Sequence, residues 1–416
     1  MVRPQTLQTP KIKRSAKERE ALYSQVIEMM AIPGGSGQEG KIAEYIRGSL
    51  LAAGAKASAI RFDSAHRRTR IKGEVGNLIY RMPGTLPRSG TAGVSTGHRM
   101  LSAHMDTVPI CVGCRPQRKG QKVTSIDSHT GLGADNRAGC GVVLSTAMEL
   151  LKQGLPHPPL TFVWFVQEEV GLQGSRFATT SLFGKPRMAF NWDGGQPAKM
   201  TIGATGGYRL VIDVSGIASH AGVCPERGVS AITIAALAIA DLQANGWHGS
   251  ICKGKRRGTS NVGVIRGGDA TNVVTDHVFV RVEARSHNRP FRERIVREIE
   301  KAFKRAVKQV KNEQGQIGSV SIAGHLDYES FCLKPSEPCV KIAESVIYAL
   351  GATPISAIAD GGVDANWITE HGIPTVSLGC GQANAHMVTE SLDLPQYLLA
   401  CNIGLSIAQG FGAEYH

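Results

Sequence analysis

The sequence predicts an α/β fold, with helices on both faces of a mixed sheet, that is interrupted by an inserted α+β domain. Strand-like and helix-like segments alternate over roughly the first two hundred residues, as they do in βα units. After about Gly206 the strands alternate polar and apolar residues instead, and the βα style resumes after about residue 320. We therefore predict an α/β domain formed by residues 1–205 and 321–416, with an inserted domain at 206–320.

In the first part of the α/β domain, the continuous apolar run LTFVWFV at residues 160–166 is typical of a strand buried on both faces. The helix before it ends near Gly154, a residue that favours helix ends. The predicted helices of this part are 20–31, 39–53 and 139–153, and the predicted strands are 76–81, 98–103, 160–166 and 188–192.

The inserted domain begins with YRLVIDV at residues 208–214, which alternates with period two, as a half-exposed strand does. Its last helix carries apolar residues every three or four positions, from Phe291 to Val310. The other predicted elements are a helix at 229–244 and strands at 260–265 and 277–284. In the second part of the α/β domain we predict a helix at 338–350, a strand at 375–378 and a final helix from about residue 395.

Composition limits the classes of protein to which the chain can belong. Of its 416 residues 42% are hydrophobic and 19% are charged, which fits a globular protein with a large core. No apolar run reaches the roughly 18 residues of a membrane span. The N-terminus has no apolar signal segment and is predicted to be a basic tail over residues 1–18. The nine scattered cysteines favour a reducing, cytoplasmic location, and the lone pair Cys111 and Cys114 is a weak signal for a metal or redox role.

The net charge of +13 is spread over several segments rather than gathered on one. Aromatic residues make up 6% of the chain and do not interleave with the basic runs. Nucleic-acid binding favours a single basic face with stacking aromatics, so we predict no nucleic-acid partner and no membrane partner. A solvated surface that attracts anionic ligands is the favoured interpretation.

Polar side chains follow the predicted strands at the points where these strands end. Ligands of open α/β sheets bind beyond the carboxyl ends of the strands, so these side chains are expected to converge. Each of them alone is more often an ordinary loop residue, but their joint order along the chain favours a site. The residues are His104, Asp106, Glu168, Glu169, Asp193 and His386, with Asp135 at the start of a helix.

Imidazole and carboxylate groups together suit Zn²⁺, Co²⁺ or Mn²⁺. Two ions that share one bridging carboxylate need five protein ligands, and the cluster supplies this number. Glu168 is then left over as a general base, and Asp106 is placed to orient His104. The five predicted ligands are His104, Asp135, Glu169, Asp193 and His386.

The motifs SAHMDTV, GLGADNRAG, VQEEVGLQGS, NWDGG and LGCGQANAHMVTE together resemble the M20 group of dinuclear zinc peptidases, and most of all its peptidase T branch. The resemblance runs from about residue 20 to the C-terminus. It implies that His104, Asp135 and Asp193 hold one ion and that Asp135, Glu169 and His386 hold the other. It also implies a cis peptide after Asp135. The next residue, Asn136, departs from the Asp that relatives commonly have there.

The resemblance implies that the inserted domain is a lid, which is also the dimerisation domain in many members. In this domain His220 matches a histidine that stabilises the oxyanion, Asn272 matches a substrate contact, and Arg285 matches an arginine that grips a substrate carboxylate. A capping histidine and a surface arginine are the alternatives for His220 and Arg285.

The expected function is metal-dependent hydrolysis of short peptides by a di- or tripeptidase of the aminopeptidase type, with Glu168 as general base. One alternative is a deacylase or amidohydrolase that acts on N-acyl or N-carbamoyl amino acids. The other is a metal-dependent binding protein without turnover, which is disfavoured because all predicted ligands and the base are present.

Overall fold

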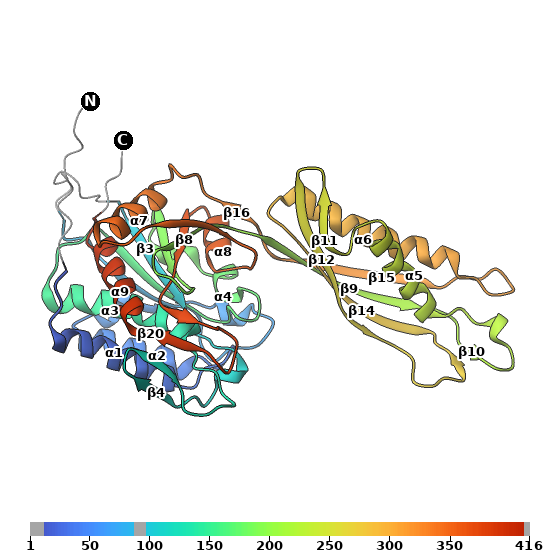
Figure 1. Cartoon of the computed structure of the whole chain (residues 1–416), viewed down its shortest axis with the longest axis horizontal. Coiled ribbons are helices and arrows are strands. Elements are labelled where there is room, and N and C mark those ends of the chain that lie inside the picture. The colour runs from blue at the N-terminus through green and yellow to red at the C-terminus, as the bar shows by residue number, and fades with distance from the viewer. Residues whose placement is uncertain (1–11, 87–96, 412–416) are drawn as a thin grey trace. The chain divides into compact units, whose positions relative to one another are not determined.

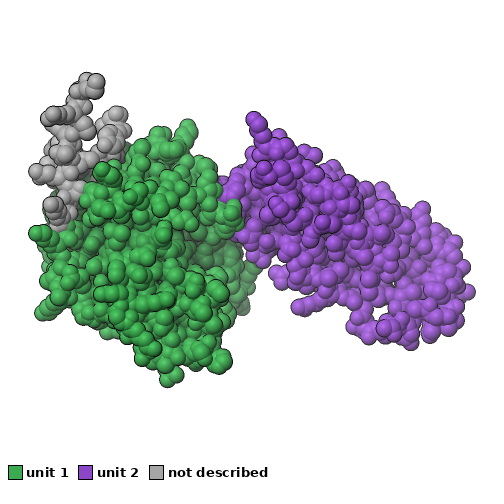
Figure 2. Space-filling view, in the orientation of Figure 1, with its two compact units in different colours: residues 1–203, 332–416 green, residues 204–331 purple. Residues whose placement is uncertain are grey.

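A computed structural model describes residues 12–86 and 97–411 of the chain. The chain divides into two compact units, coloured separately in Figure 2. The first unit runs up to Gly203 and resumes at Cys332, and the second spans Ala204–Phe331. The second unit extends beyond the predicted bound of residue 320 because strand β15, Ser319–Tyr328, pairs along its length with β9 of the same unit.

The first unit is built on a mixed sheet, as the sequence predicts. Its strand order is β1-β2-β6-β3-β7-β18-β8-β16, with β17 beside β8. Strands β3, β6, β7 and β18 run parallel to their neighbours in this group, whereas β2 and β8 are antiparallel to theirs. The strands are β1 Ile60–Phe62, β2 Leu78–Met82, β3 Arg99–His104, β6 Leu160–Phe165, β7 Met188–Trp192, β8 Lys199–Ala204, β16 Phe331–Cys332, β17 Ile355–Ala359 and β18 Thr375–Leu378.

Helices cover both faces of this sheet (Figure 1). On one face the Trp164 indole Nε1–H donates to the Cys140 carbonyl oxygen of helix α3 at 3.3 Å. The side chain of Val163 points the opposite way, as strand alternation requires, and clusters with Ile368 of helix α8. The helices of this unit are α1 Ala16–Ala31, α2 Gly40–Ala52, α3 Ala134–Gln153, α4 Gln173–Arg176, α7 Pro338–Ala349, α8 Ala365–Glu370 and α9 Leu394–Ala408.

A small antiparallel sheet also belongs to the first unit, in the order β19-β20-β5-β4. Its strands are β4 Pro116–Lys119, β5 Lys122–Ser125, β19 Gln382–Ala383 and β20 Ser391–Asp393. The connection between β19 and β20 carries His386, so this sheet anchors both ends of the loop on which that histidine lies.

Turns of 3₁₀ helix occupy Ala57–Ala59, Ala65–Arg67, Pro109–Cys111 and Thr180–Phe183 in the first unit and Pro225–Arg227 in the second.

The predicted basic tail is shorter than residues 1–18. Residues 1–11 lie outside the described part of the chain, but Ser15 caps helix α1 in a capping box with Glu18. The guanidinium of Arg14 donates to both carboxylate oxygens of Glu149 at 2.8 Å, and its side chain is only 7% exposed. Arg14, Ser15 and helix α1 are therefore part of the fold.

The second unit is a five-stranded antiparallel sheet with two helices on one face (Figure 1). Leu210, Ile212 and Val214 are buried beneath the helices, while the residues between them are partly exposed. This alternation agrees with the period-two pattern of the sequence. The strands in sheet order are β11 Gly249–Lys253, β12 Arg256–Arg266, β14 His277–Ser286, β9 Gly206–Ser215 and β15. The helices are α5 Ala231–Ala244 and α6 Arg289–Gln309, and β10 Ser219–His220 pairs with β13 Val273–Val274 as a separate ribbon.

Within residues 12–86 and 97–411, no helix combines the length and the apolar character that crossing a membrane would require.

Candidate metal centre

The carboxyl ends of the parallel strands bring most of the predicted site residues to one edge of the first unit's sheet. His104 is the last residue of β3, and Asp193 directly follows β7. Glu168 and Glu169 come shortly after β6 ends at Phe165. Asp135 lies in the first turn of α3, and His386 approaches from the β19–β20 loop. Ligands bind at this edge in open α/β sheets.

Asp135 lies between the two histidines. Its Oδ1 is 3.3 Å from Nε2 of His104, and its Oδ2 is 3.3 Å from Nε2 of His386. Asp193 lies on the His104 side, with Oδ2 at 3.9 Å from Nε2 of His104. Glu169 lies on the His386 side, with Oε2 at 3.0 Å from Nε2 of His386. The five predicted ligands thus form two groups that share Asp135.

Asp106 lies behind His104. The Nδ1 atom of His104 is 3.3 Å from Oδ1 of Asp106, and both side chains are buried. The Nε2 atom therefore faces the other side, toward Asp135 and Asp193. A carboxylate behind a histidine fixes the ring and its tautomer when the opposite nitrogen is a metal ligand.

The two adjacent glutamates lie in a turn rather than in the strand. Gln167 has a φ of 53°, in the left-handed region that a non-glycine residue rarely adopts. Its backbone N–H donates to Oε1 of the buried Glu39 at 3.0 Å. Strand alternation would point Glu168 and Glu169 in opposite directions, and this turn removes the constraint.

The charged groups of the cluster shift one another's pKa values. Burial raises the pKa of Glu168 well above its usual range, and burial together with Asp135 raises the pKa of Asp193 to about 7. Hydrogen bonds to Asp135 and Glu169 raise the pKa of His386 to about 10. Burial lowers the pKa of His104, but Glu168, Asp106 and Asp135 outweigh this effect and raise it. Like charges repel at short range, so a cation bound among these carboxylates would favour their charged forms.

The donor set fits divalent cations. Among the described residues, two groups offer ligand atoms within 4.8 Å of one another: His104 with Asp135 and Glu169, and His104 with Glu168 and Asp193. Nitrogen and carboxylate oxygen are ligands that Zn²⁺ and its neighbours accept. The second group includes Glu168, which the sequence assigns as the base rather than as a ligand, so its role needs a functional test.

The peptide bond between Asp135 and Asn136 is cis, as the family resemblance implies. Both polar atoms of the Asn136 side chain are hydrogen-bonded to backbone groups outside the candidate ligands. Its Nδ2 donates to the Trp192 carbonyl oxygen at 2.7 Å, and its Oδ1 accepts from the Gly139 N–H at 3.0 Å. The departure from Asp at this position therefore leaves the candidate ligands unchanged.

Two buried carboxylates near the cluster were not predicted from the sequence. Glu390 accepts the backbone N–H of Asp135 at 2.8 Å. Asp364 is completely buried, and burial raises its pKa to about 6 while His104 and Glu169 act on it electrostatically. The only signal for Asp364 is its place after Gly361 and Gly362 at a helix start, and Glu390 ends the motif that contains His386.

The three remaining predicted residues belong to the second unit. His220 is exposed in β10, and its Nδ1 accepts from the Gly222 N–H at 3.2 Å. Asn272 lies on the same ribbon, where its carbonyl oxygen accepts from the Ala221 N–H at 2.9 Å. Arg285 lies in β14, with a guanidinium nitrogen 3.1 Å from Oε2 of Glu283. Their assignment to substrate binding stays a prediction.

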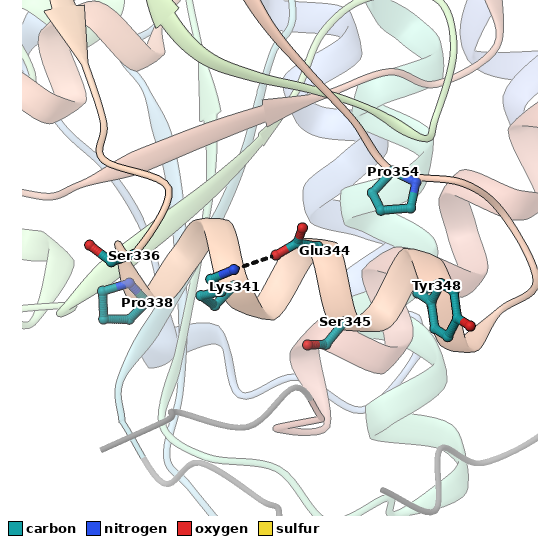
Figure 3. Close-up of a pocket in the computed structure, with 7 residues that line it drawn as sticks. All are labelled: Ser336, Pro338, Lys341, Glu344, Ser345, Tyr348 and Pro354. Carbon is teal, nitrogen blue, oxygen red and sulfur yellow. Dashed lines mark hydrogen bonds and ion pairs between the residues drawn. The ribbon is translucent and has the colours of Figure 1, made fainter. Parts of the chain in front are cut away.

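A surface groove of about 630 Å³ lies along helix α7, away from this cluster (Figure 3). An ion pair of 2.8 Å joins two of its lining residues, Lys341 and Glu344. None of the predicted site residues lines it, so it is not a candidate for the catalytic centre. Its lining residues are Ser336, Pro338, Lys341, Glu344, Ser345, Tyr348 and Pro354.

Comparison with known families matches both parts of the chain to peptidases. The peptidase dimerisation domain of the M20 group matches residues 202–311. Peptidase family M28 matches residues 83–208. These two matches correspond to the inserted domain and to part of the α/β domain.

Similar proteins extend over most of the chain. YqjE of Bacillus subtilis, itself uncharacterized, is 29% identical over 335 residues, which cover 80% of this chain and 84% of YqjE. The structure of a tripeptidase from Staphylococcus aureus matches with a TM-score of 0.83 and 28% identity, covering 94% of this chain and 98% of the tripeptidase. The structure of aminopeptidase PepT from Bacillus cereus matches with a TM-score of 0.81 and 29% identity, with the same coverage of 94% and 98%.

Proposed function

We propose that this chain, which belongs to the M20 family of peptidases, is a metal-dependent aminopeptidase that cleaves di- or tripeptides. The observation that carries the proposal is the arrangement around Asp135, which contacts both histidines and lies beside the glutamate pair. The similarity to a tripeptidase and to an aminopeptidase over nearly the whole chain supports the same substrate class.

Two divalent cations are proposed to bind this cluster, with Zn²⁺ preferred and Co²⁺ or Mn²⁺ as alternatives. His104, Asp135 and Asp193 would hold one ion, and Asp135, Glu169 and His386 would hold the other, in keeping with the contacts of Asp135. When bound, such ions supply an activated water and positive charge that polarises the scissile carbonyl.

Glu168 is proposed to be the general base. Its side chain is buried, and its backbone is fixed by the N–H bond to Oδ1 of Asp106 at 2.9 Å. Burial raises its pKa above the usual range of a carboxyl group, which is the direction that a general base requires. In this role its carboxylate would accept a proton from the attacking water and then deliver that proton to the leaving amine.

His220, Asn272 and Arg285 are proposed to act on the substrate. Arg285 would bind the terminal carboxylate of a short peptide, because a guanidinium fork matches a carboxylate in geometry and charge. His220 would stabilise the oxyanion, and Asn272 would contact the substrate. The match of residues 202–311 to a dimerisation domain supports a homodimer formed through the second unit.

The proposed location is the cytoplasm. This rests on the number and scatter of the nine cysteines, all of which are free thiols in the structure.

The test is hydrolysis of a panel of free and N-blocked di-, tri- and tetrapeptides by metal-stripped protein to which Zn²⁺, Co²⁺ or Mn²⁺ is added in turn. We expect cleavage of peptides with a free amino terminus, stopping when the ion is chelated. Activity confined to N-acyl or N-carbamoyl substrates would contradict an aminopeptidase and favour a deacylase. Stoichiometric metal binding without turnover of any substrate would favour a binding protein.

A further inference from the structure

Glu390 is a buried carboxylate to which the proposed chemistry gives no role. It is 1% exposed, and both of its oxygens are hydrogen-bonded to backbone. Oε1 accepts the N–H of Asp135 at 2.8 Å, and Oε2 accepts the N–H of Gly133 at 2.6 Å. A buried carboxylate is costly unless donors surround it, so these contacts are a built feature of the fold.

The carboxylate binds the irregular backbone at the start of α3 from a distant part of the sequence. Gly133 has a φ of 75°, and the backbone angles of Asp135 and Asn136 are not helical. A buried backbone N–H without an acceptor costs free energy. Glu390 accepts the N–H groups of Gly133 and Asp135, and in doing so it holds the backbone of the residue that contacts both histidines.

Glu390 also terminates the loop that carries His386. The His386 side chain is 53% exposed and its φ is 64°, so little packing fixes it directly. The Glu390 N–H donates to the Met387 carbonyl oxygen at 3.0 Å, which closes the turn between the two residues. One side chain therefore joins the loop of His386 to the loop of Asp135.

Neighbouring groups pack closely around the Glu390 carboxylate. The Cys111 thiol donates to Oε2 of Glu390 at 3.4 Å. A side chain at Gly131 would lie 2.7 Å from Sγ of Cys111 and 3.2 Å from Oε2 of Glu390. Cys111, one of the two cysteines of the CxxC pair, therefore has a structural role, because its thiol donates a hydrogen bond to Glu390.

We propose that Glu390 is a positioning residue that sets the spacing between Asp135 and His386 and thereby the affinity for the ion that these two residues share. The inference rests on the proposed dinuclear metal site. The partners that orient metal ligands typically contribute about 10–100-fold to metal affinity.

The experiment titrates metal-stripped wild type and Glu390→Gln with Zn²⁺ against a chromophoric chelator, with His386→Ala marking the binding step that needs His386. Gln keeps the size of the side chain but directs an amide N–H₂ at one of the two backbone donors. We expect the His386-dependent step to weaken about 10–100-fold, with a smaller change in the other step.

Asp63→Asn is the matched control. Asp63 is also a buried carboxylate that accepts backbone N–H groups, from Ala65 at 3.0 Å, Asn77 at 2.9 Å and Thr179 at 3.0 Å, and none of these donors is a candidate ligand. The Asp63→Asn variant should have a lower melting temperature but wild-type affinity in both metal-binding steps. If Glu390→Gln binds both ions with wild-type affinity, or if its metal affinities change no more than those of the control variant, the positioning role is wrong.

The outcomes separate this inference from the proposed function. Wild type that binds no second ion would overturn the dinuclear site itself, whereas normal wild-type binding with unaffected Glu390→Gln overturns only the positioning role. Should the variant fail to fold, amide hydrogen exchange of metal-stripped wild type decides the matter. The amides of Gly133 and Asp135 are expected to be protected without metal, and rapid exchange of both would refute the proposal.

Discussion

The carboxylate of Asp106 accepts the backbone N–H of Glu168, with a distance of 2.9 Å from nitrogen to Oδ1. Its Oδ2 accepts the next N–H, that of Glu169, at 3.1 Å. The same carboxylate is 3.3 Å from Nδ1 of His104. One buried side chain therefore fixes the turn of the two glutamates and the ring of a candidate ligand, which explains how adjacent like charges are held together at the end of β6.

Glu168→Gln separates the role of base from the role of ligand. Gln cannot accept the proton of the attacking water, so kcat should fall by about 10²–10⁴-fold while the metal content stays at the wild-type value. Metal analysis and steady-state kinetics on the same sample measure both. Near-normal turnover would refute the base assignment, and loss of one ion would show that Glu168 is a ligand.

Asp106→Asn should weaken metal binding without removing a ligand. The amide offers one acceptor where the carboxylate serves two N–H groups, so one donor is left unsatisfied at a cost of about 1–3 kcal/mol. We expect a lower melting temperature and about 10–100-fold weaker binding of the ion held by His104. Ser36→Ala is the control, since it removes only the hydroxyl that donates to Asp106 at 2.7 Å and should change binding much less.

His386→Ala should reduce the metal content from two ions to one. His386 contacts Asp135 and Glu169 but none of the atoms of Asp193, so its loss leaves the group around His104 complete. Elemental analysis after dialysis against limiting Zn²⁺ measures the ratio of metal to protein. A ratio of two in the variant would mean that another group replaces the imidazole.

Metal binding should release protons, and more of them at lower pH. Without metal, hydrogen bonds to Asp135 and Glu169 raise the pKa of His386 to about 10, and burial with Asp135 raises that of Asp193 to about 7. Cations bind the deprotonated forms, so His386 loses its proton on binding at any pH below about 10, His104, whose pKa is also raised, loses one as well, and Asp193 adds a further proton below about 7.

The sign of the effect is therefore a metal affinity that rises with pH, by about tenfold per pH unit for each proton released. Calorimetric titration in two buffers of different ionisation enthalpy counts the protons released on metal binding. It is carried out at two pH values, about one pH unit below and about one pH unit above neutrality. Equal counts at the two pH values, or an affinity that falls as pH rises, would contradict this account.

Local sequence patterns predicted most of the fold. The apolar run at residues 160–166 corresponds to β6, and the spacing from Phe291 to Val310 corresponds to α6. Strand β15 was missed, although pairing with β9 extends along it. Its residues SVSIAGHLDY alternate polar and apolar side chains except around Gly324, so the period-two pattern was a usable signal for this strand.

Some residues of the candidate site could be predicted from the sequence and others could not. The predicted ligands could be found because each follows a strand end or begins a helix, where the local pattern itself marks the position. Asp364 and Glu390 could not be found in this way, since a lone carboxylate in a loop looks like a solvated surface residue until its burial is known.

The sequence alone determined the alternation of strands and helices, the insertion in the α/β domain, and the set of imidazole and carboxylate side chains, because periodicity and residue chemistry are local properties. Only the tertiary structure decided that Asp135 contacts both histidines and that Glu390 joins their two loops. These relationships depend on the parallel register of β3, β6, β7 and β18 and on the β19–β20 hairpin. Register and long-range hydrogen bonds are settled by packing between segments far apart in the chain, which no local pattern records.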